Sequence, residues 1–198
     1  MSSERKPGVV VIPMIRFDPG VGEVELLTID SQEENGAKLG ELCPLVPGAE
    51  VKSLVGKPEF PGGKQEDSQS VLETAISEFV SETGVHPDVD FKDRLKFIFE
   101  DFPIDQLRPE LTHLRPKLTH FAVKVALLEL TQNEVCSLER QGAERVLVSL
   151  ADGVVKNKTS GRQVELRPAH EAIIRYLAAI ANSFVSTSAR GERVEAYG

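Results

Sequence analysis

Two glutamates, Glu78 and Glu82, stand four residues apart, shortly after the run Pro61-Gly62-Gly63. On a helix this spacing stacks two side chains on one face, one turn apart. The glycines indicate a turn, because glycine reaches backbone angles that other residues avoid. Stacked carboxylates beside main-chain carbonyls suit a hard divalent cation such as Mg²⁺, which binds oxygen and keeps waters and phosphate oxygens in its shell. Most isolated pairs of this kind are ordinary solvated helix glutamates, so the surrounding elements decide between the two interpretations.

The sequence predicts a helix over residues 71–83 that would carry this pair. Ser70 followed by Glu73 forms a capping box, which satisfies unpaired amides at a helix start. No Pro or Gly interrupts the segment until Gly84, which supplies the end. Apolar residues recur at helical spacing and predict a buried stripe, made of Leu72, Ala75, Ile76 and Phe79. Glu78 and Glu82 flank this stripe, so we expect them near the rim of the core.

Strands and helices alternate along the rest of the chain. We expect strands at 8–17, 23–29, 95–102, 118–130 and 146–150, and a second helix at 168–184. The first two strands are separated by the turn signal Asp18-Pro19-Gly20, so they should form a hairpin. In the strand predicted at 118–130, the apolar residues alternate at Phe121, Val123, Val125 and Leu127. Residues 31–57 are rich in glycine and proline and predict a long loop.

The segment from Gly63 to Val85 resembles the signature of the Nudix hydrolases, G-x5-E-x7-R-E-U-x-E-E-x-G-U, where U is a bulky aliphatic residue. The register holds without a gap. The matching positions are Gly63, Glu78, Phe79 (in a U position), Glu82, Gly84 and Val85. Three positions depart from the signature: Gln69 replaces the first Glu, Ser77 the Arg, and Ser81 the first Glu of the Glu-Glu pair.

The resemblance implies an α/β fold, a Nudix-like α/β/α sandwich with a mixed sheet. The domain would cover residues 8–185, with an N-terminal tail at 1–7 and a flexible C-terminal tail at 186–198. Members of this family cleave a nucleoside diphosphate linked to another group, using a divalent metal and an activated water.

For this chain the resemblance implies that Glu78 and Glu82 hold Mg²⁺ or Mn²⁺, together with the main-chain carbonyl near Gly62 or Gly63. The family also recruits an acidic residue from elsewhere in the fold. Glu134, Glu139 and Glu144 are equal candidates for that position. The three neutral replacements imply weakened metal binding and reduced activity, because each removes a charge that positions metal or helix.

A near-repeat occupies residues 107–113 and 114–120, and each copy reads L-R-P-x-L-T-H. It precedes a predicted central strand, where loops of such a fold line the substrate cleft. We therefore predict that Arg108 and Arg115, with Lys64 beside the glycines, contact substrate phosphates. The histidine that ends each copy is an acid–base candidate. Chance similarity within a loop is the competing interpretation, because two copies are too few for a repeat architecture.

Composition limits the partners. The net charge of −8 disfavours RNA, because nucleic-acid affinity rests on Lys and Arg at phosphates, but it permits a small nucleotide held through metal. Two cysteines are too few for a disulfide framework, so we expect the cytoplasm or another reducing compartment. No segment is long and apolar enough for a membrane span, so we expect no membrane association. The pattern does not predict an oligomeric state.

Two function classes follow from the sequence. The first is a divergent, metal-dependent hydrolase of nucleoside diphosphate derivatives, favoured by the presence of Glu78 and Glu82. The second is a catalytically inactive Nudix-fold module that binds RNA, a nucleotide or a protein partner. Gln69, Ser77 and Ser81 favour the second, because the family carries charged residues at those positions.

Overall fold

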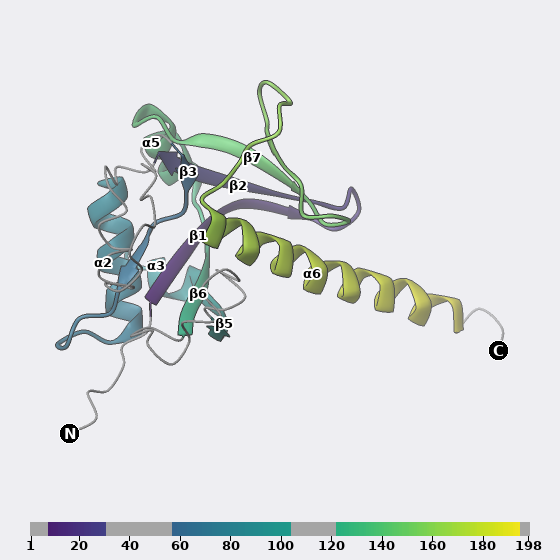
Figure 1. The fold of residues 1–198 in the computed structure, drawn as a ribbon, viewed down its shortest axis with the longest axis horizontal. Helices are drawn as coiled ribbons and strands as arrows, with labels where there is room; N and C mark the ends of the chain where they lie inside the picture. Colours follow the sequence, from purple (N-terminus) through teal and green to yellow (C-terminus); the bar gives the residue numbers. More distant parts are fainter. Residues whose placement is uncertain (1–7, 31–56, 104–121, 195–198) are drawn as a thin grey trace, which may run out of the picture.

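The computed structural model describes residues 8–30, 57–103 and 122–194 (Figure 1). Its centre is an eight-stranded sheet with the order β5-β6-β1-β2-β7-β8, extended by β3 on β2 and by β4 on β1. The strands are β1 (Gly8–Asp18), β2 (Glu23–Asp30), β3 (Pro58–Glu59), β4 (Gly62–Lys64), β5 (Leu95–Pro103), β6 (Ala122–Glu129), β7 (Glu144–Ser149) and β8 (Val155–Asn157). The helices are α2 (Val71–Thr83), α3 (Phe91–Arg94), α5 (Gln132–Arg140) and α6 (Pro168–Val194).

The sheet is mixed, because β1 pairs in parallel with β6 and antiparallel with β2 and β4. The central strand β1 divides the core, since successive side chains on a strand point to opposite faces. Val9 and Val11 belong to the core under α2, α3 and α5, and Val10 and Ile12 belong to the core under α6. The helices therefore cover both faces of the sheet (Figure 1), and the predicted α/β fold with a mixed sheet between helices is confirmed.

The predicted hairpin is confirmed, with β1 and β2 paired from Met14–Leu26 to Asp18–Glu23. The strand expected at 118–130 is β6 in the described part of the chain. Its residues Val123, Val125 and Leu127 face the α6 side, as the apolar alternation predicts. Ala126 and Leu128 fill the opposite core, because this strand lies in the interior of a covered sheet. The predicted loop at 31–57 and the near-repeat lie, except for residue 57, outside the described residues.

Three helices differ from the prediction, and the short helix α3 is one that was not expected. Helix α5 was not expected, although Thr131 and Glu134 form a capping box at its start, with Glu134 N–H donating to Thr131 Oγ1. Helix α6 begins at Pro168 as predicted but ends at Val194, beyond the expected end at Phe184. The expected end rested on the last apolar residue of the repeat; no proline follows it, and loss of an apolar stripe does not itself stop a helix.

Residues 186–194, predicted to belong to a flexible tail, are thus helical, and this part of α6 extends away from the sheet (Figure 1). The limits of the domain and its tails stay a prediction. In the described part of the chain, no helix combines the length and apolar character needed to cross a membrane.

Candidate active site

Helix α2 has the ends that its sequence predicts. Ser70 N–H donates to Glu73 Oε2 at 2.7 Å, and Glu73 N–H donates to Ser70 Oγ at 3.2 Å. The Ser70 amide, which donates to the Glu73 carboxylate, is the main cause that lowers the pKa of Glu73, and the Ser70 side chain adds to it. At the other end Gly84 takes the left-handed conformation, with φ of 64°, and its N–H donates to Val80 O. The capping box and the glycine stop are confirmed, and they set the phase of the glutamates between them.

The buried face of α2 is centred on Ala75 and Phe79, both fully buried, and Phe79 packs against Phe91 with ring centroids 5.3 Å apart. Leu72 and Ile76 of the predicted stripe are only half-buried. The face is therefore rotated from the apolar stripe, and buried threonines complete it. Each uses its hydroxyl locally, as Thr83 does by donating to Phe79 O.

Glu78 and Glu82 leave this face and meet the glycine segment. Gly62 N–H donates to Glu82 Oε2 at 3.0 Å. The carboxylate of Glu78 lies against Gly63, in the volume that a side chain on that residue would occupy. The structure thus brings together both predicted carboxylates and the glycines, and the hydrogen bond between Gly62 and Glu82 joins residues 20 positions apart in the sequence.

The glycine segment itself is a strand rather than the predicted turn. Gly62 and Gly63 belong to β4, which pairs with Val10 and Val9 of β1, and neither has a positive φ. Space requires a glycine at position 62, and Gly63 leaves room for the Glu78 carboxylate. A Cβ at Gly62 would collide with the carbonyl oxygen of Val9, and a Cβ at Gly63 would collide with the carboxylate of Glu78. Glycine occurs at these two positions because β1 and the Glu78 carboxylate lie close to the backbone of β4, and not because a turn needs it.

Of the three residues that depart from the signature, two make local hydrogen bonds and one is exposed to solvent. Gln69 Oε1 accepts a hydrogen bond from Thr74 Oγ1 at 3.2 Å, and Ser81 Oγ donates to Glu78 O at 3.1 Å. Ser77 is exposed. Gln69 and Ser81 therefore bond within or beside the first and last turns of α2.

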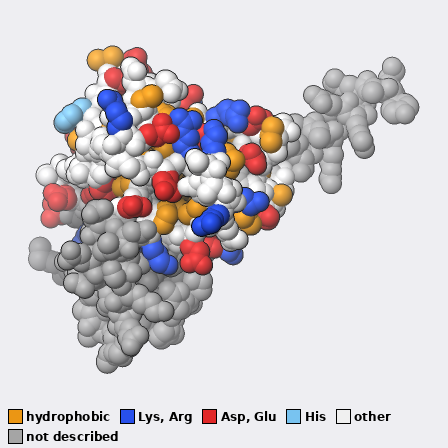
Figure 2. Space-filling view, turned by 90° about the horizontal axis from the view of Figure 1, so that it is seen from above, with side chains coloured by type: hydrophobic (Ala, Val, Ile, Leu, Met, Phe, Trp, Pro, Cys, Tyr) orange, Lys and Arg blue, Asp and Glu red, His pale blue; other side chains and the backbone are white. Residues whose placement is uncertain are grey.

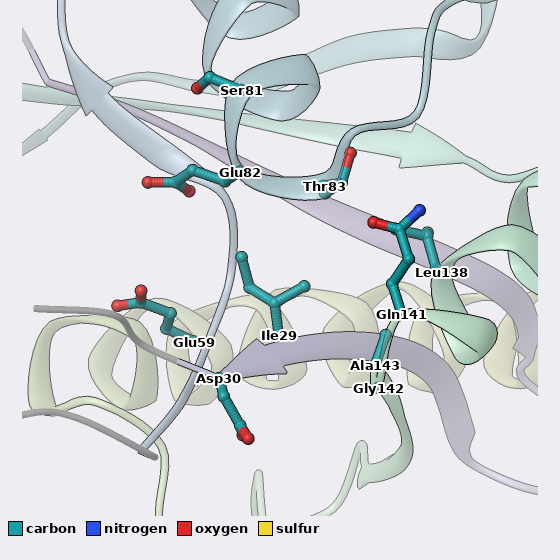
Figure 3. Close-up of a pocket in the computed structure, with 10 residues that line it drawn as sticks. All are labelled: Ile29, Asp30, Glu59, Ser81, Glu82, Thr83, Leu138, Gln141, Gly142 and Ala143. Atoms are coloured by element: carbon teal, nitrogen blue, oxygen red, sulfur yellow. The ribbon is translucent and has the colours of Figure 1, made fainter.

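A cavity of about 500 Å³ lies beside the last turn of α2 (Figure 3). Its lining residues come from β2, β3, α2, α5 and the α5–β7 connection: Ile29, Asp30, Glu59, Ser81, Glu82, Thr83, Leu138, Gln141, Gly142 and Ala143. The carboxylates of Glu59 and Glu82 point to the same side in this view, and Asp30 points away from them. Aliphatic and acidic walls together suit a ligand with an apolar part and hydroxyl or metal-bound groups.

Glu59 is the acidic residue near the site that sequence analysis missed. It is buried, lines the same cavity as Glu82, and pairs with Arg167, whose Nη1 lies 3.0 Å from Glu59 Oε2. Its position four residues before Gly63 was an available signal, but its partner is 108 residues away in the sequence. Only the folded chain shows that this carboxylate is compensated rather than solvated.

The acidic residues proposed to complete the metal site have other partners. Glu134 receives two hydrogen bonds from Arg94, at 2.8 and 2.9 Å, and caps α5. Glu139 pairs with Arg145 at 2.6 Å, which lowers the pKa of that carboxyl. Glu144 accepts from Asn157 Nδ2 at 2.8 Å. None of the three lines the cavity beside Glu82.

Of the predicted phosphate contacts, Lys64 is exposed at the end of β4, directly after the two glycines. Arg108 and Arg115 lie outside the described residues. On the face shown in Figure 2, Lys and Arg side chains are interspersed with Asp and Glu over the described surface. That mixture gives a weaker attraction for a long polyanion than a continuous basic surface would.

The residues where β4 meets α2 offer the type of ligand atom, oxygen, that a divalent ion such as Mg²⁺ binds. Mg²⁺ takes hard oxygen ligands and is commonly held by one or two carboxylates plus waters and substrate phosphates. A carboxylate has about four acceptor positions, so the hydrogen bond from Gly62 leaves Glu82 further capacity. Within residues 8–30, 57–103 and 122–194, no group of three or more His, Cys, Asp or Glu side chains could hold a metal ion. Among the described residues, Glu78 and Glu82 are the carboxylates that this junction would offer to an ion.

Comparisons with known proteins give structural similarity alone. No family model matches the sequence, and no curated protein sequence matches it. One similar solved structure is a MutT/nudix family protein from Enterococcus faecalis, with 12% identity and a TM-score of 0.45, over 88% of this chain and 61% of that one. Another is a mutT/nudix family protein from Listeria innocua, with 14% identity and a TM-score of 0.48, over 93% of this chain and 98% of that one. This chain therefore spans less than two thirds of the Enterococcus faecalis chain.

Proposed function

We propose that this chain is a divergent Nudix-type hydrolase that cleaves a nucleoside diphosphate linked to another group, with reduced or specialised activity. Glu78 and Glu82 would hold one divalent ion, Mg²⁺ or Mn²⁺, with help from the Gly63 carbonyl. The observation that carries the proposal is the docking of both carboxylates on Gly62 and Gly63 in the register of the hydrolase signature.

The ion, when bound, would polarise a phosphate and lower the pKa of a coordinated water. The chain's own residues prepare its position. The Gly62 amide holds one oxygen of Glu82, and the bare Cα of Gly63 leaves room for the Glu78 carboxylate. We place the substrate in the adjacent cavity, with Lys64, Arg108 and Arg115 as the proposed phosphate contacts.

Reduced activity follows from the three neutral positions. Loss of one electrostatic or positioning group commonly costs roughly two to three orders of magnitude in rate. Gln69 and Ser81 bond to α2 or its first turn, and Ser77 offers no positive charge to fix the helix. Glu59 lines the same cavity as Glu82, but the described residues form no group of three acidic side chains for a metal ion, so we assign Glu59 no ligand role.

The test is a hydrolysis screen over nucleotide sugars, dinucleoside polyphosphates, nucleoside triphosphates and capped RNA, with Mg²⁺ or Mn²⁺ present. The proposal expects metal-dependent turnover of at least one class, lost in Glu82→Gln and Glu78→Gln. Glu165→Gln, at an exposed position outside the cavity, is the matched control and should retain turnover. Mn²⁺ binding that depends on Glu78 and Glu82 without any turnover would instead support the inactive nucleotide-binding module.

A further inference from the structure

A buried histidine of α6 bonds directly to the segment that precedes the glycines. His170 has 5% of its surface exposed, and its Nδ1 accepts a hydrogen bond from Phe60 N–H at 2.9 Å. The two rings also stack, with centroids 5.6 Å apart and planes inclined by 25°. The imidazole thus contacts Phe60 through both its edge and its face.

His170 is neutral in the folded protein, because burial lowers its pKa to about 3. With Nδ1 accepting, the proton of the neutral ring lies on Nε2. Burial therefore keeps Nδ1 available as an acceptor for the Phe60 amide. The alternative for that amide is a buried donor without a partner, which folded proteins avoid.

Arg167, which directly precedes α6, bonds to the two residues before Phe60. Its N–H donates to Pro58 O at 3.1 Å, and its guanidinium pairs with Glu59. The next residues are held from the other side, since Val11 N–H donates to Pro61 O at 2.8 Å and Glu82 accepts from Gly62. Each residue from 58 to 62 therefore has a hydrogen bond or ion pair to another element.

We infer that His170 and Arg167 are positioning residues of the proposed site: the start of α6 fixes residues 58–62, and this fixed strand in turn places the carboxylate of Glu82. The inference rests on the proposed function for the role of Glu82. It assigns no contact with substrate to either residue. Both act through the backbone that ends in the Gly62 amide.

Residues 58–62 have little room to move. Gly62 lies so close to β1 that a single added carbon would collide with Val9 O and approach Val10. β3 has two residues and pairs with β2 only at Ile29–Glu59 and Asp30–Pro58, so the sheet alone holds this part of the chain by a short ladder. Arg167 and His170 add contacts to residues 58–60, and β1 contacts the residues that follow, through Pro61 and through its pairing with β4.

The test compares His170→Leu, which removes the acceptor, with His170→Asn, whose Oδ1 can take the place of Nδ1. In His170→Leu, amide exchange at Gly62 should accelerate roughly tenfold, as expected for loss of about one hydrogen bond's worth of protection. The carboxyl carbon of Glu82 should shift in the NMR spectrum. The Mn²⁺ dissociation constant should rise roughly tenfold, since residues that orient ligands affect metal affinity by about that factor. His170→Asn should restore all three.

Val148→Ala, which removes core volume in β7, is the control for general destabilisation and should change none of the three readouts once global stability is matched. If His170→Leu does not fold, Arg167→Met tests the same path through Glu59. The inference would be overturned if amide exchange at Gly62 were unchanged in His170→Leu. It would also be overturned if that exchange were faster while the NMR signal of the Glu82 carboxyl carbon did not shift. Failure of the wild type to bind Mn²⁺ or turn over any substrate would refute the proposed function, and the exchange and NMR readouts would still decide the positioning.

Discussion

Gly62 and Gly63 are adjacent, yet a side chain on each would meet a different kind of neighbour. At Gly62 the obstacle is backbone, the carbonyl oxygen of Val9 and the Cα of Val10. At Gly63 it is the end of the Glu78 side chain. A backbone in a paired strand can hardly move aside, whereas a half-buried carboxylate can rotate away. The same substitution should therefore have separable effects at the two positions.

We expect Gly62→Ala to lower the free energy of unfolding by about 1–3 kcal/mol, the usual range for overpacking. Gly63→Ala should cost less stability but should weaken Mn²⁺ binding, because the methyl group displaces the Glu78 carboxylate. Denaturant melts and calorimetric Mn²⁺ titrations on both variants measure the two effects. Equal stability losses with unchanged Mn²⁺ heats would contradict this account of the glycines.

Ser81 is the residue at which adding charge should be informative. It is exposed, lines the cavity and precedes Glu82. Ser81→Glu should raise divalent affinity, because hard cations bind more tightly as carboxylates accumulate. Turnover should appear or increase in Ser81→Glu, and it should increase more when Gln69→Glu and Ser77→Arg are added. The Gln69→Glu change keeps the oxygen that accepts the hydrogen bond from Thr74.

Asn133→Glu adds the same charge on an exposed position of α5 and is the control for Ser81→Glu. It should alter neither Mn²⁺ affinity nor turnover. A wild-type activity that falls in Ser81→Glu would show instead that the Ser81 hydroxyl has a role of its own.

At the scale of elements, α2 has one face that packs in the core and an adjacent edge that carries the two glutamates. Phe79 and Ala75 anchor it to the core shared with α3 and α5, and this fixes the rotation that sends Glu78 and Glu82 to β4. The capping box sets where the helix begins, and Gly84 where it ends. Anything that rotates or frays α2 should therefore disturb the carboxylates as well as stability.

Phe79→Ala should reduce the free energy of unfolding by about 3–5 kcal/mol, because the ring is fully buried and packs on Phe91. Ser70→Ala should cost about 1 kcal/mol through loss of the cap. Ile76→Ala should cost less than Phe79→Ala, since the structure corrects its expected core position to a half-buried one. Denaturant melts rank the three, and a Phe79→Ala variant as stable as wild type would show that the helix face is wrongly placed.

At the scale of the whole molecule, two cores on opposite faces of one sheet are joined through the strands between them. Helix α6 belongs to one core and α2 to the other, yet both reach the 58–62 segment. His170 bonds at Phe60, and Glu82 bonds at Gly62. The stability of the α6 contacts should therefore respond to the protonation of His170.

The pH dependence has a definite sign. The pKa of His170 falls to about 3 on folding, so between about pH 6.5 and pH 3 the unfolded chain binds a proton that the folded chain does not. Stability should therefore decline as pH is lowered through this window, by up to about 1.4 kcal/mol per pH unit from this residue. His170→Asn should show a shallower decline between pH 6.5 and 5 in denaturant melts. His86→Asn, at an exposed position, is the control, and equal slopes for all three proteins would refute the assignment.

The sequence by itself determined the elements whose signals are local. The ends of α2 follow from Ser70, Glu73 and Gly84, and the first hairpin follows from two apolar runs around one turn. The stacking of Glu78 and Glu82 on one edge of α2 also follows from their spacing along the helix. Helix α5 could have been found in the same way, from its own capping box.

Only the tertiary structure decided which distant groups complete the candidate site. The reason for Gly62 and Gly63 is the closeness of β1 and Glu78, which no turn rule encodes. Glu59 becomes a buried, paired carboxylate because Arg167 lies against it, and Phe60 finds its acceptor in His170, 110 residues later. Such contacts depend on how β3, β4 and α6 pack together, and a spacing rule extends only a few residues along the chain.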